Sequence, residues 1–279
     1  MSVSELIDFL EDADAAIIGK EKINDNTLQK AHRLKIISKY GVGLDSIDEK
    51  SLKRRNITLG WTGGINKRSV AELTLCFMLG LYRNIFQSGF QLKKTGWEKN
   101  GGQLLTEKTI GIIGCGNIGS DVIQLLSPFN NSILINDITD KTKFFKNKNI
   151  KQVSLDSLIV RSDIISLHVP LTDLTTNMVN KNFLRKMKPS AFLINTSRGN
   201  IVNQTALYSA LKKSTIAGAA LDVFSEEPPT DENFLSLPNL MVTPHIGGNA
   251  QEAVEAMGRS AIKHLALFFK AAQSNALSI

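Results

Sequence analysis

The chain has 279 residues, of which 42% are hydrophobic and 21% charged, values typical of a globular protein with one or two domains. No run approaches the roughly 18 apolar residues of a membrane-spanning helix, and the acidic N-terminal segment argues against a signal peptide, so a cytoplasmic location is expected. The net charge of +7 is dispersed along the chain, which argues against a nucleic-acid partner and favours small anionic substrates.

Cysteine and histidine residues show no pattern typical of a metal site. Cys76 and Cys115 each lie in apolar sequence, and the four histidines have no ligand-like spacing. We therefore expect neither a disulfide nor a metal ion, and we interpret Cys76 as a residue of the core.

The first part of the chain alternates short apolar runs with polar segments of helical character. Strands are predicted at residues 15–18, 34–38 and 57–59. Helical segments are predicted at residues 24–32 and 46–55. A long amphipathic helix is predicted over residues 69–94, because apolar residues recur there every three or four positions.

From residue 109 onward, strand-like and helical runs alternate clearly. Strands are predicted at residues 109–114, 132–137, 163–169, 191–195, 216–223 and 240–245. Because these runs are apolar throughout, they are typical of a parallel sheet that is covered on both faces. The pattern predicts an α/β fold with a doubly wound parallel sheet, and a final helix over residues 249–270.

A glycine motif lies directly after the first of these strands. Gly114, Gly116 and Gly119 have the spacing G-x-G-x-x-G, and an apolar-periodic helix follows them. In such a motif the first glycine allows a tight turn, the second lets the backbone approach a pyrophosphate, and the third lets helix and strand pack closely. This context predicts a dinucleotide site at the N-terminus of the helix.

An acidic residue, Asp137, ends the next strand. A carboxylate at that position accepts hydrogen bonds from the ribose 2′-hydroxyl and repels a 2′-phosphate. No arginine follows it in the next three residues, so the sequence predicts NAD rather than NADP.

Polar residues follow the remaining strands of the predicted sheet. Arg198 comes after the run "AFLIN", acidic residues follow residue 221, and His245 follows "LMVTP". Because ligands of doubly wound sheets bind beyond the carboxyl ends of the strands, these side chains are expected to converge. Oxidation of a 2-hydroxy acid needs a guanidinium for the carboxylate, a histidine for the proton and a carboxylate that orients the histidine. Arg198 is therefore predicted to face a cleft and bind an anion.

These segments resemble the D-isomer-specific 2-hydroxyacid dehydrogenases, and among them the D-3-phosphoglycerate dehydrogenase branch. The matching segments are "YGVGLDSID" (40–48), "NKRSVAEL" (66–73), "GIIGCGNIG" (111–119), "SLHVPLT" (166–172), "LINTSRGNIV" (193–202), "AGAALDVFSEEPP" (217–229) and "TPHIGG" (243–248). The resemblance implies an NAD-dependent enzyme that interconverts a D-2-hydroxy acid and its 2-keto acid. It implies 3-phosphoglycerate or a related small acid, such as hydroxypyruvate or glyoxylate, as the substrate.

The resemblance also implies a role for individual residues. Arg198 would bind the substrate, His245 would be the acid/base and Glu227 its partner. Cofactor contacts are implied for Gly114, Gly116, Asn117, Ile118, Gly119, Asp137, His168, Pro170, Thr196, Asp222 and Gly247, of which Asp222 would hold the nicotinamide carboxamide. Substrate contacts are implied for Lys39, Val42, Gly43 and Asn66, of which Lys39 stands where some relatives carry an arginine.

The family's architecture implies two domains. A Rossmann-type NAD-binding domain is expected at residues 74–248, and a smaller flavodoxin-like substrate domain at residues 1–73 plus 249–279. Family members usually have a further strand and helix before the segment that begins here at Ser4, so the substrate domain is expected to be N-terminally shortened. A homodimer built by residues 69–103 is also implied.

Two alternatives remain open at this level. The same fold serves as a non-enzymatic, dimeric NAD-sensing scaffold in corepressors, although the presence of Arg198, Glu227 and His245 together argues against it. A relative acting on formate or phosphite is less favoured, because those enzymes extend the front half of the chain.

Overall fold

The computed structural model describes residues 1–142 and 149–276, and the chain divides into two compact units. The first unit contains residues 1–66 and 249–279, and the second contains residues 67–248. The predicted boundary after residue 73 lies inside a helix, whereas the division between the units lies at the first residue of that helix, Lys67. A continuous helix packs as one piece, so residues 67–73 go with the second unit.

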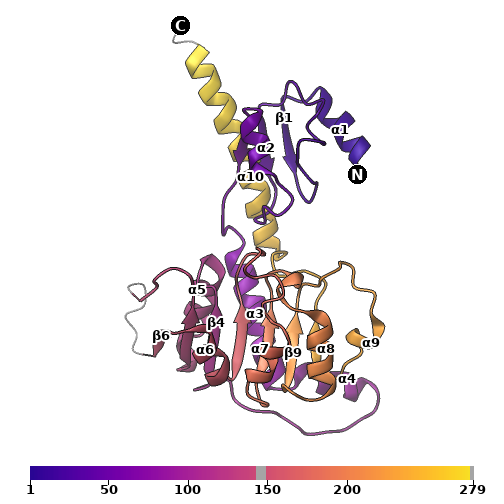
Figure 1. Cartoon of the computed structure of the whole chain (residues 1–279), viewed down its shortest axis with the longest axis vertical. Coiled ribbons are helices and arrows are strands. Elements are labelled where there is room, and N and C mark those ends of the chain that lie inside the picture. Colours follow the sequence, from indigo (N-terminus) through magenta and orange to yellow (C-terminus); the bar gives the residue numbers. More distant parts are fainter. Residues whose placement is uncertain (143–148, 277–279) are drawn as a thin grey trace. The chain divides into compact units, whose positions relative to one another are not determined.

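The first unit is a three-stranded parallel sheet between helices (Figure 1). Its elements are α1 (Val3–Glu11), β1 (Ala15–Ile18), β2 (Ile36–Lys39), α2 (Glu49–Arg54), β3 (Thr58–Gly60) and α10 (Gln251–Ala276), with strand order β1-β2-β3. Ile37 lies in the apolar core with α1 and α2, while Ser38 donates to the carbonyl of Ala261 in α10 at 2.8 Å. Because successive residues of a strand face opposite sides, α10 covers the other face of the sheet.

The second unit contains a seven-stranded parallel sheet with the order β10-β9-β8-β7-β4-β5-β6. Its strands are β4 (Thr109–Ile113), β5 (Ser132–Asn136), β6 (Ile150–Gln152), β7 (Ile164–Leu167), β8 (Phe192–Asn195), β9 (Gly218–Leu221) and β10 (Leu240–Val242). The order reverses between β4 and β7, where Ile113 pairs with Leu167. The predicted doubly wound α/β fold is confirmed, and ligands of such sheets bind beyond the carboxyl ends on either side of this reversal.

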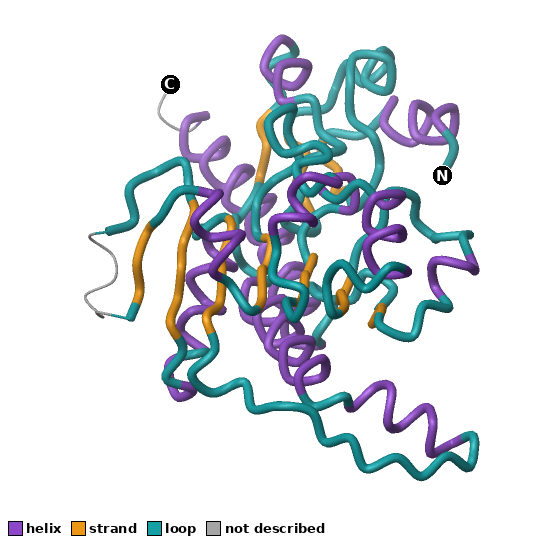
Figure 2. Tube along the Cα trace, turned by 60° about the horizontal axis from the view of Figure 1, so that its bottom comes forward, coloured by secondary structure: helices purple, strands orange, loops and turns teal. Residues whose placement is uncertain are grey.

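Helices cover both faces of the larger sheet (Figure 2, helices purple and strands orange). The helical elements of this unit are α3 (Lys67–Tyr82), α4 (Ile85–Lys93), α5 (Asn117–Leu125), η1 (Ser127–Phe129), α6 (Leu155–Arg161), α7 (Lys181–Lys186), η2 (Gly199–Ile201), α8 (Gln204–Lys212) and α9 (Glu232–Leu235). Ile112 lies in the core under α3 and α5, and its neighbour Ile113 lies in the core under α6, α7 and α8. Burial on both faces explains why the strands are apolar throughout.

Several elements differ from the sequence-based predictions. Residues 24–32 form turns rather than a helix, and the unpredicted helix α1 is capped reciprocally by Ser2 and Glu5. The predicted helix at residues 69–94 is two helices, because Asn84 adopts a left-handed conformation with φ 51° that interrupts the series of helical hydrogen bonds. The short edge strand β6 was also missed, since it has only three residues and none is fully buried.

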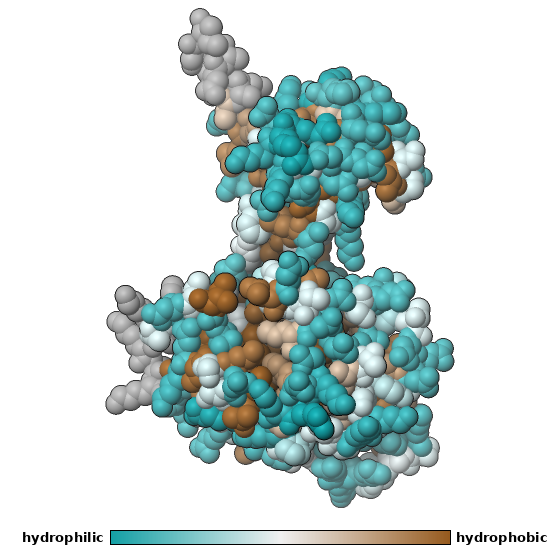
Figure 3. Space-filling model, viewed as in Figure 1, coloured by the Kyte–Doolittle hydropathy of each residue, from teal (hydrophilic) through white to brown (hydrophobic). Residues whose placement is uncertain are grey.

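On the face that Figure 3 shows, the surface of each unit is mostly hydrophilic, and hydrophobic residues gather on part of the larger unit. Cys76 is exposed, so its assignment to the core was wrong, whereas Cys115 is buried. Among residues 1–142 and 149–276, no helix has the length and apolar character needed to cross a membrane.

Candidate functional site

The glycine motif forms the turn between β4 and α5. Gly114 has φ +87°, and a Cβ atom there would lie 2.4 Å from the carbonyl oxygen of His168, so only glycine fits. Gly116 precedes α5, offers no capping side chain and has open space where a Cβ would lie. The first N–H groups of α5, at Asn117 and Ile118, therefore face an open approach that suits a phosphate group.

Asp137 follows β5 and faces the same turn. Its Oδ2 accepts from the backbone N–H of Cys115 at 2.7 Å, and its Oδ1 accepts from the N–H and hydroxyl of Thr139 at 2.8 Å each. Burial raises the pKa of Asp137, but these hydrogen bonds and the nearby Lys141 outweigh that effect and hold the pKa below its usual value. The carboxylate is thus ionised and held in a fixed orientation.

Two helices that flank the motif are joined by an ion pair that the sequence analysis missed. Arg68, at the start of α3, donates from Nε and Nη2 to the two carboxylate oxygens of Asp121 in α5 at 2.8 and 3.0 Å. The Asp121 side chain is only 3% exposed. This bidentate pair fixes the glycine-motif helix against α3.

The same helix, α3, also contacts two segments from the other half of the sheet. The hydroxyl of Ser69 donates to the carbonyl of Gly247 at 2.6 Å, and the hydroxyls of Thr74 and Thr196 are 3.1 Å apart. Thr74 and Thr196 are buried. The first two turns of α3 therefore join segments that carry predicted cofactor-binding residues.

Arg198 lies at the end of the turn that follows β8. The side chain of the buried Asn195 organises this turn: its Oδ1 accepts from the N–H and hydroxyl of Ser197 at 3.0 and 2.8 Å, and its Nδ2 donates to the carbonyl of Arg198 at 2.9 Å. Arg198 Nη1 donates to the carbonyl of Ser197 at 2.7 Å. The arginine is partly buried.

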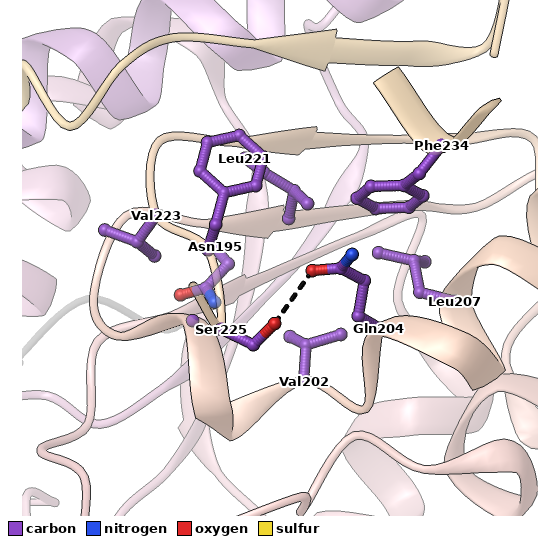
Figure 4. Close-up of a pocket in the computed structure, with 10 residues that line it drawn as sticks. Asn195, Val202, Gln204, Leu207, Leu221, Val223, Ser225 and Phe234 are labelled. Carbon is purple, nitrogen blue, oxygen red and sulfur yellow. Dashed lines mark hydrogen bonds between the residues drawn. The ribbon is translucent and has the colours of Figure 1, made fainter. Parts of the chain in front are cut away.

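The Arg198 turn packs directly on the segment that carries Glu227. A Cβ atom at Gly199 would lie 1.9 Å from the carbonyl of Phe224, so the two segments touch backbone to backbone. A cavity of about 10 Å³, close to the space of one water, lies beside this contact (Figure 4). Across it, the hydroxyl of Ser225 donates to Gln204 Oε1 at 3.0 Å, which ties the Glu227 segment to α8.

Glu227 and His245 form a hydrogen-bonded pair. Glu227 Oε2 lies 2.7 Å from His245 Nδ1, and Glu227 Oε1 accepts from the N–H of Phe224 at 3.2 Å. Both side chains are about a third exposed, at 34% and 40%. A carboxylate on Nδ1 directs the opposite ring nitrogen, Nε2, toward any substrate.

His245 sits in a turn that is held by Asp222. Asp222 is 1% exposed and accepts three hydrogen bonds, from the hydroxyl of Thr243 at 2.6 Å and from the N–H groups of Ile246 and Gly247 at 2.8 Å each. His245 has φ +54°, an uncommon conformation that these bonds on either side maintain. Asp222 therefore positions the His245 turn.

His168 and Pro170 follow β7 at the point where the strand order reverses. His168 Nε2 lies 2.9 Å from the hydroxyl of Ser166, and its Nδ1 is buried with no hydrogen-bond partner among the residues that the structure describes. Burial lowers the pKa of His168 to about 3, so the ring is neutral. A buried ring atom without a partner beside the glycine turn is one of the observations that favour a bound ligand there.

The four predicted substrate residues belong to the first unit. Lys39 ends β2, is buried and donates from Nζ to the carbonyl of Gly19. Val42 is held through its carbonyl, which accepts from the indole of Trp61 at 3.0 Å, and Gly43 follows it. Asn66 has a buried Oδ1 that accepts no hydrogen bond in the described part of the chain.

Together these residues suit a dinucleotide and an anionic acid better than a metal ion. The open helix N-terminus, the oriented Asp137 and the unsatisfied His168 Nδ1 fit a dinucleotide, and Arg198 with the Glu227–His245 pair suits proton and anion chemistry. No group of three or more His, Cys, Asp or Glu residues that could hold a metal occurs within residues 1–142 and 149–276. The fold and site define an α/β nucleotide-dependent oxidoreductase.

Comparison with known proteins identifies the family. Residues 75–247 match the D-isomer specific 2-hydroxyacid dehydrogenase, NAD binding domain. Hydroxypyruvate reductase of Thermotoga maritima is 37% identical over 260 residues, which cover 91% of this chain and 84% of the relative. D-3-Phosphoglycerate dehydrogenase of Methanocaldococcus jannaschii is 36% identical over 262 residues, which cover 92% of this chain but 50% of that relative.

A solved structure agrees with this assignment. D-Lactate dehydrogenase of Aquifex aeolicus, complexed with NAD and lactic acid, has a TM-score of 0.85 and 30% identity, with coverage of 95% of this chain and 85% of that one. The chain belongs to the D-isomer-specific 2-hydroxyacid dehydrogenases. The predictions of the family, of an NAD-dependent oxidoreductase and of NAD as the cofactor are confirmed.

Proposed function

We propose that this chain interconverts a short D-2-hydroxy acid and its 2-keto acid at a site formed around Arg198, His245 and Glu227. The observation that carries the proposal is the 2.7 Å contact between Glu227 and His245 Nδ1, which leaves Nε2 for proton exchange. Arg198 lies in a turn that packs on the Glu227 segment, so the three side chains belong to one packed set of loops.

Each of these residues has a distinct task. Arg198 binds the substrate carboxylate and polarises the keto oxygen, because a guanidinium is always charged and can bind two oxygens at once. His245 Nε2 gives its proton to that oxygen during reduction and takes it back during oxidation. Glu227 holds the ring through Nδ1 and so fixes its orientation.

Residues from both halves of the sheet would hold the cofactor, with the adenosine side at the β4–β6 half. NAD, when bound, supplies the ring carbon that accepts or gives up the hydride. The N-terminus of α5 and its glycine turn hold the pyrophosphate, Asp137 holds the ribose hydroxyls, and the proposed contacts of His168, Pro170, Thr196 and Gly247 lie near the nicotinamide. Asp222, beyond positioning the His245 turn, is proposed to accept from the carboxamide.

For the substrate we propose a short acid, such as hydroxypyruvate or glyoxylate, in preference to 3-phosphohydroxypyruvate. Lys39 is buried and already donates to the carbonyl of Gly19, which disfavours a role as a phosphate ligand. Relatives with the names hydroxypyruvate reductase and D-3-phosphoglycerate dehydrogenase have similar identities, so sequence similarity alone does not decide between these acids. Val42, Gly43 and Asn66 are proposed to contribute the remaining substrate contacts.

The test is NADH oxidation by the purified protein with a panel of 2-keto acids that includes 3-phosphohydroxypyruvate. We expect turnover with a short acid and a loss of kcat/KM of about a hundredfold to a thousandfold in Arg198→Ala. Arg185→Ala, an exposed arginine of α7, is the matched control. NADH binding without turnover of any acid would contradict the proposal and favour a sensing scaffold.

We also propose that the protein is a homodimer in the cytoplasm. Helix α4 has no buried residue and, with the loop after it, projects from its unit as an arm (Figure 2). Its exposed apolar residues are Ile85, Phe86, Phe90 and Leu92, and the loop adds Trp97 and Leu104. Apolar surface of this kind is typical of an interface, and the free thiols suit a reducing compartment.

Light scattering tests the dimer. We expect the wild-type mass to be twice that of the chain and Phe86→Glu with Phe90→Glu to be monomeric. Phe9→Glu, which changes an exposed phenylalanine of α1, should remain dimeric. A wild-type monomer would contradict this part of the proposal.

A further inference from the structure

The loop that carries Asp137 is clamped by one side chain from the edge strand β6. Gln152, the last residue of β6, donates from Nε2 to the carbonyls of Asp137 at 3.2 Å and Thr139 at 3.0 Å. Its Oε1 accepts from the backbone N–H of Lys141 at 2.7 Å. One carboxamide therefore binds the backbone of every second residue of the loop, at positions 137, 139 and 141. Its NH₂ group donates two hydrogen bonds and its oxygen accepts one.

The clamp acts on the loop that carries Asp137, between β5 and β6. The Asp137 carboxylate is bonded within its own turn to Thr139 and to Cys115 of the glycine motif. Within this turn, Ile138 is 99% exposed, so packing of its side chain contributes little. Polar contacts rather than a buried core must hold the backbone of residues 137–141.

We propose that Gln152 is a positioning residue for the adenosine side of the cofactor site and maintains selectivity for NAD over NADP. This inference rests on the proposed placement of Asp137 beside the ribose. A carboxylate discriminates between a 2′-hydroxyl and a 2′-phosphate only while it cannot turn away from the larger group. Gln152 fixes the backbone from which that carboxylate projects, and so acts through Asp137.

The test is Gln152→Met, which keeps the length of the side chain and the net charge but removes all three hydrogen bonds. NADH and NADPH dissociation constants are measured directly by the fluorescence of the bound nucleotide, and kcat and KM for the keto acid are measured separately. We expect the ratio of the NADPH to the NADH dissociation constant to fall about tenfold, because a carboxylate that can turn away holds the ribose hydroxyls less well and repels a 2′-phosphate less. The KM for the keto acid should not change.

Two further variants separate positioning from general destabilisation. Gln124→Met, an exposed glutamine of α5, makes the same change elsewhere in the unit and should bind both nucleotides like the wild type. Gln152→Glu retains the acceptor for Lys141 but replaces the donor to the two carbonyls, so it should also weaken NADH binding. A fall in thermal stability with an unchanged ratio of NADH to NADPH affinity would overturn the inference.

Failure of the inference and failure of the proposed function give different results. Wild-type protein that binds NADH and turns over an acid, together with a Gln152→Met variant of unchanged selectivity, would overturn the inference alone. Wild-type protein that does not bind NADH would overturn the proposed function and the inference together.

Discussion

The two halves of the seven-stranded sheet hold their functional carboxylates in different ways. In the β7–β10 half, Asp222 is 1% exposed, and both of its carboxylate oxygens accept hydrogen bonds from the His245 turn. In the β4–β6 half, Asp137 is partly exposed and its loop is held by Gln152. The buried carboxylate organises the backbone around His245, in addition to the carboxamide contact proposed for it, whereas the partly exposed carboxylate is the one proposed to contact the ribose.

The comparison predicts the largest effect for the chemistry itself. His245→Asn should lower kcat by about a hundredfold to ten-thousandfold, because His245 is the group that we propose to exchange the proton with the substrate. Asparagine tolerates the left-handed conformation at this position, φ +54°, so the turn should survive. Steady-state kinetics measure the loss, and an unchanged NADH dissociation constant shows that the cofactor half is intact. Weakened NADH binding would show that the halves are not separable.

Removing a charge from the buried carboxylate should destabilise the fold as well as slow the reaction. In Asp222→Asn, an amide NH₂ group faces a backbone N–H of the His245 turn that donates to the carboxylate in the wild type. One of these donors is then left without an acceptor, and an unsatisfied buried donor costs about 1–3 kcal/mol of unfolding free energy. Urea unfolding and kcat should both change. Asp173→Asn, an exposed aspartate, serves as the control. Full stability of Asp222→Asn would contradict the role given to the three hydrogen bonds.

The matching change in the other half should alter recognition and reduce stability less than Asp222→Asn does, because Asp137 is only partly buried. Asp137→Asn should shift the ratio of NADH to NADPH affinity toward NADPH by about tenfold, since the charge that repels a 2′-phosphate is gone while the amide oxygen still accepts. Nucleotide titrations measure the ratio. An unchanged ratio would remove Asp137 from the ribose site, and with it the contrast with Asp222.

The smallest effect concerns His168, at the reversal of strand order between the halves. The pKa of His168 is about 3 in the folded protein and about 6.5 in the unfolded chain. Between these two pH values the unfolded state binds a proton and the folded state does not. Stability should therefore fall as the pH drops from about 6.5 toward 3. In His168→Gln, Tm should decline less steeply over this range than in the wild type. His32→Gln, an exposed histidine, should behave like the wild type.

The sequence was sufficient for the parts of the fold that depend on local pattern. The strand at Ala15–Ile18 has the predicted bounds, and six of the strands of the larger sheet lie within the apolar runs that predicted them. Failures came where local pattern is weak. Strand β6 has three partly exposed or exposed residues, and Asn84 breaks a continuous apolar periodicity through its backbone conformation alone.

Residue types and spacing thus determined the doubly wound sheet, the glycine turn, NAD and the family, because each depends on a short segment read with its neighbours. The tertiary structure decided which side chains meet. Arg68 bonds to Asp121, Ser69 to Gly247 and Gln152 to the Asp137 loop across sequence separations that no local pattern encodes. Such contacts follow from how helices pack on a sheet, and a hydrogen bond between distant residues forms only once that packing has placed donor and acceptor within reach.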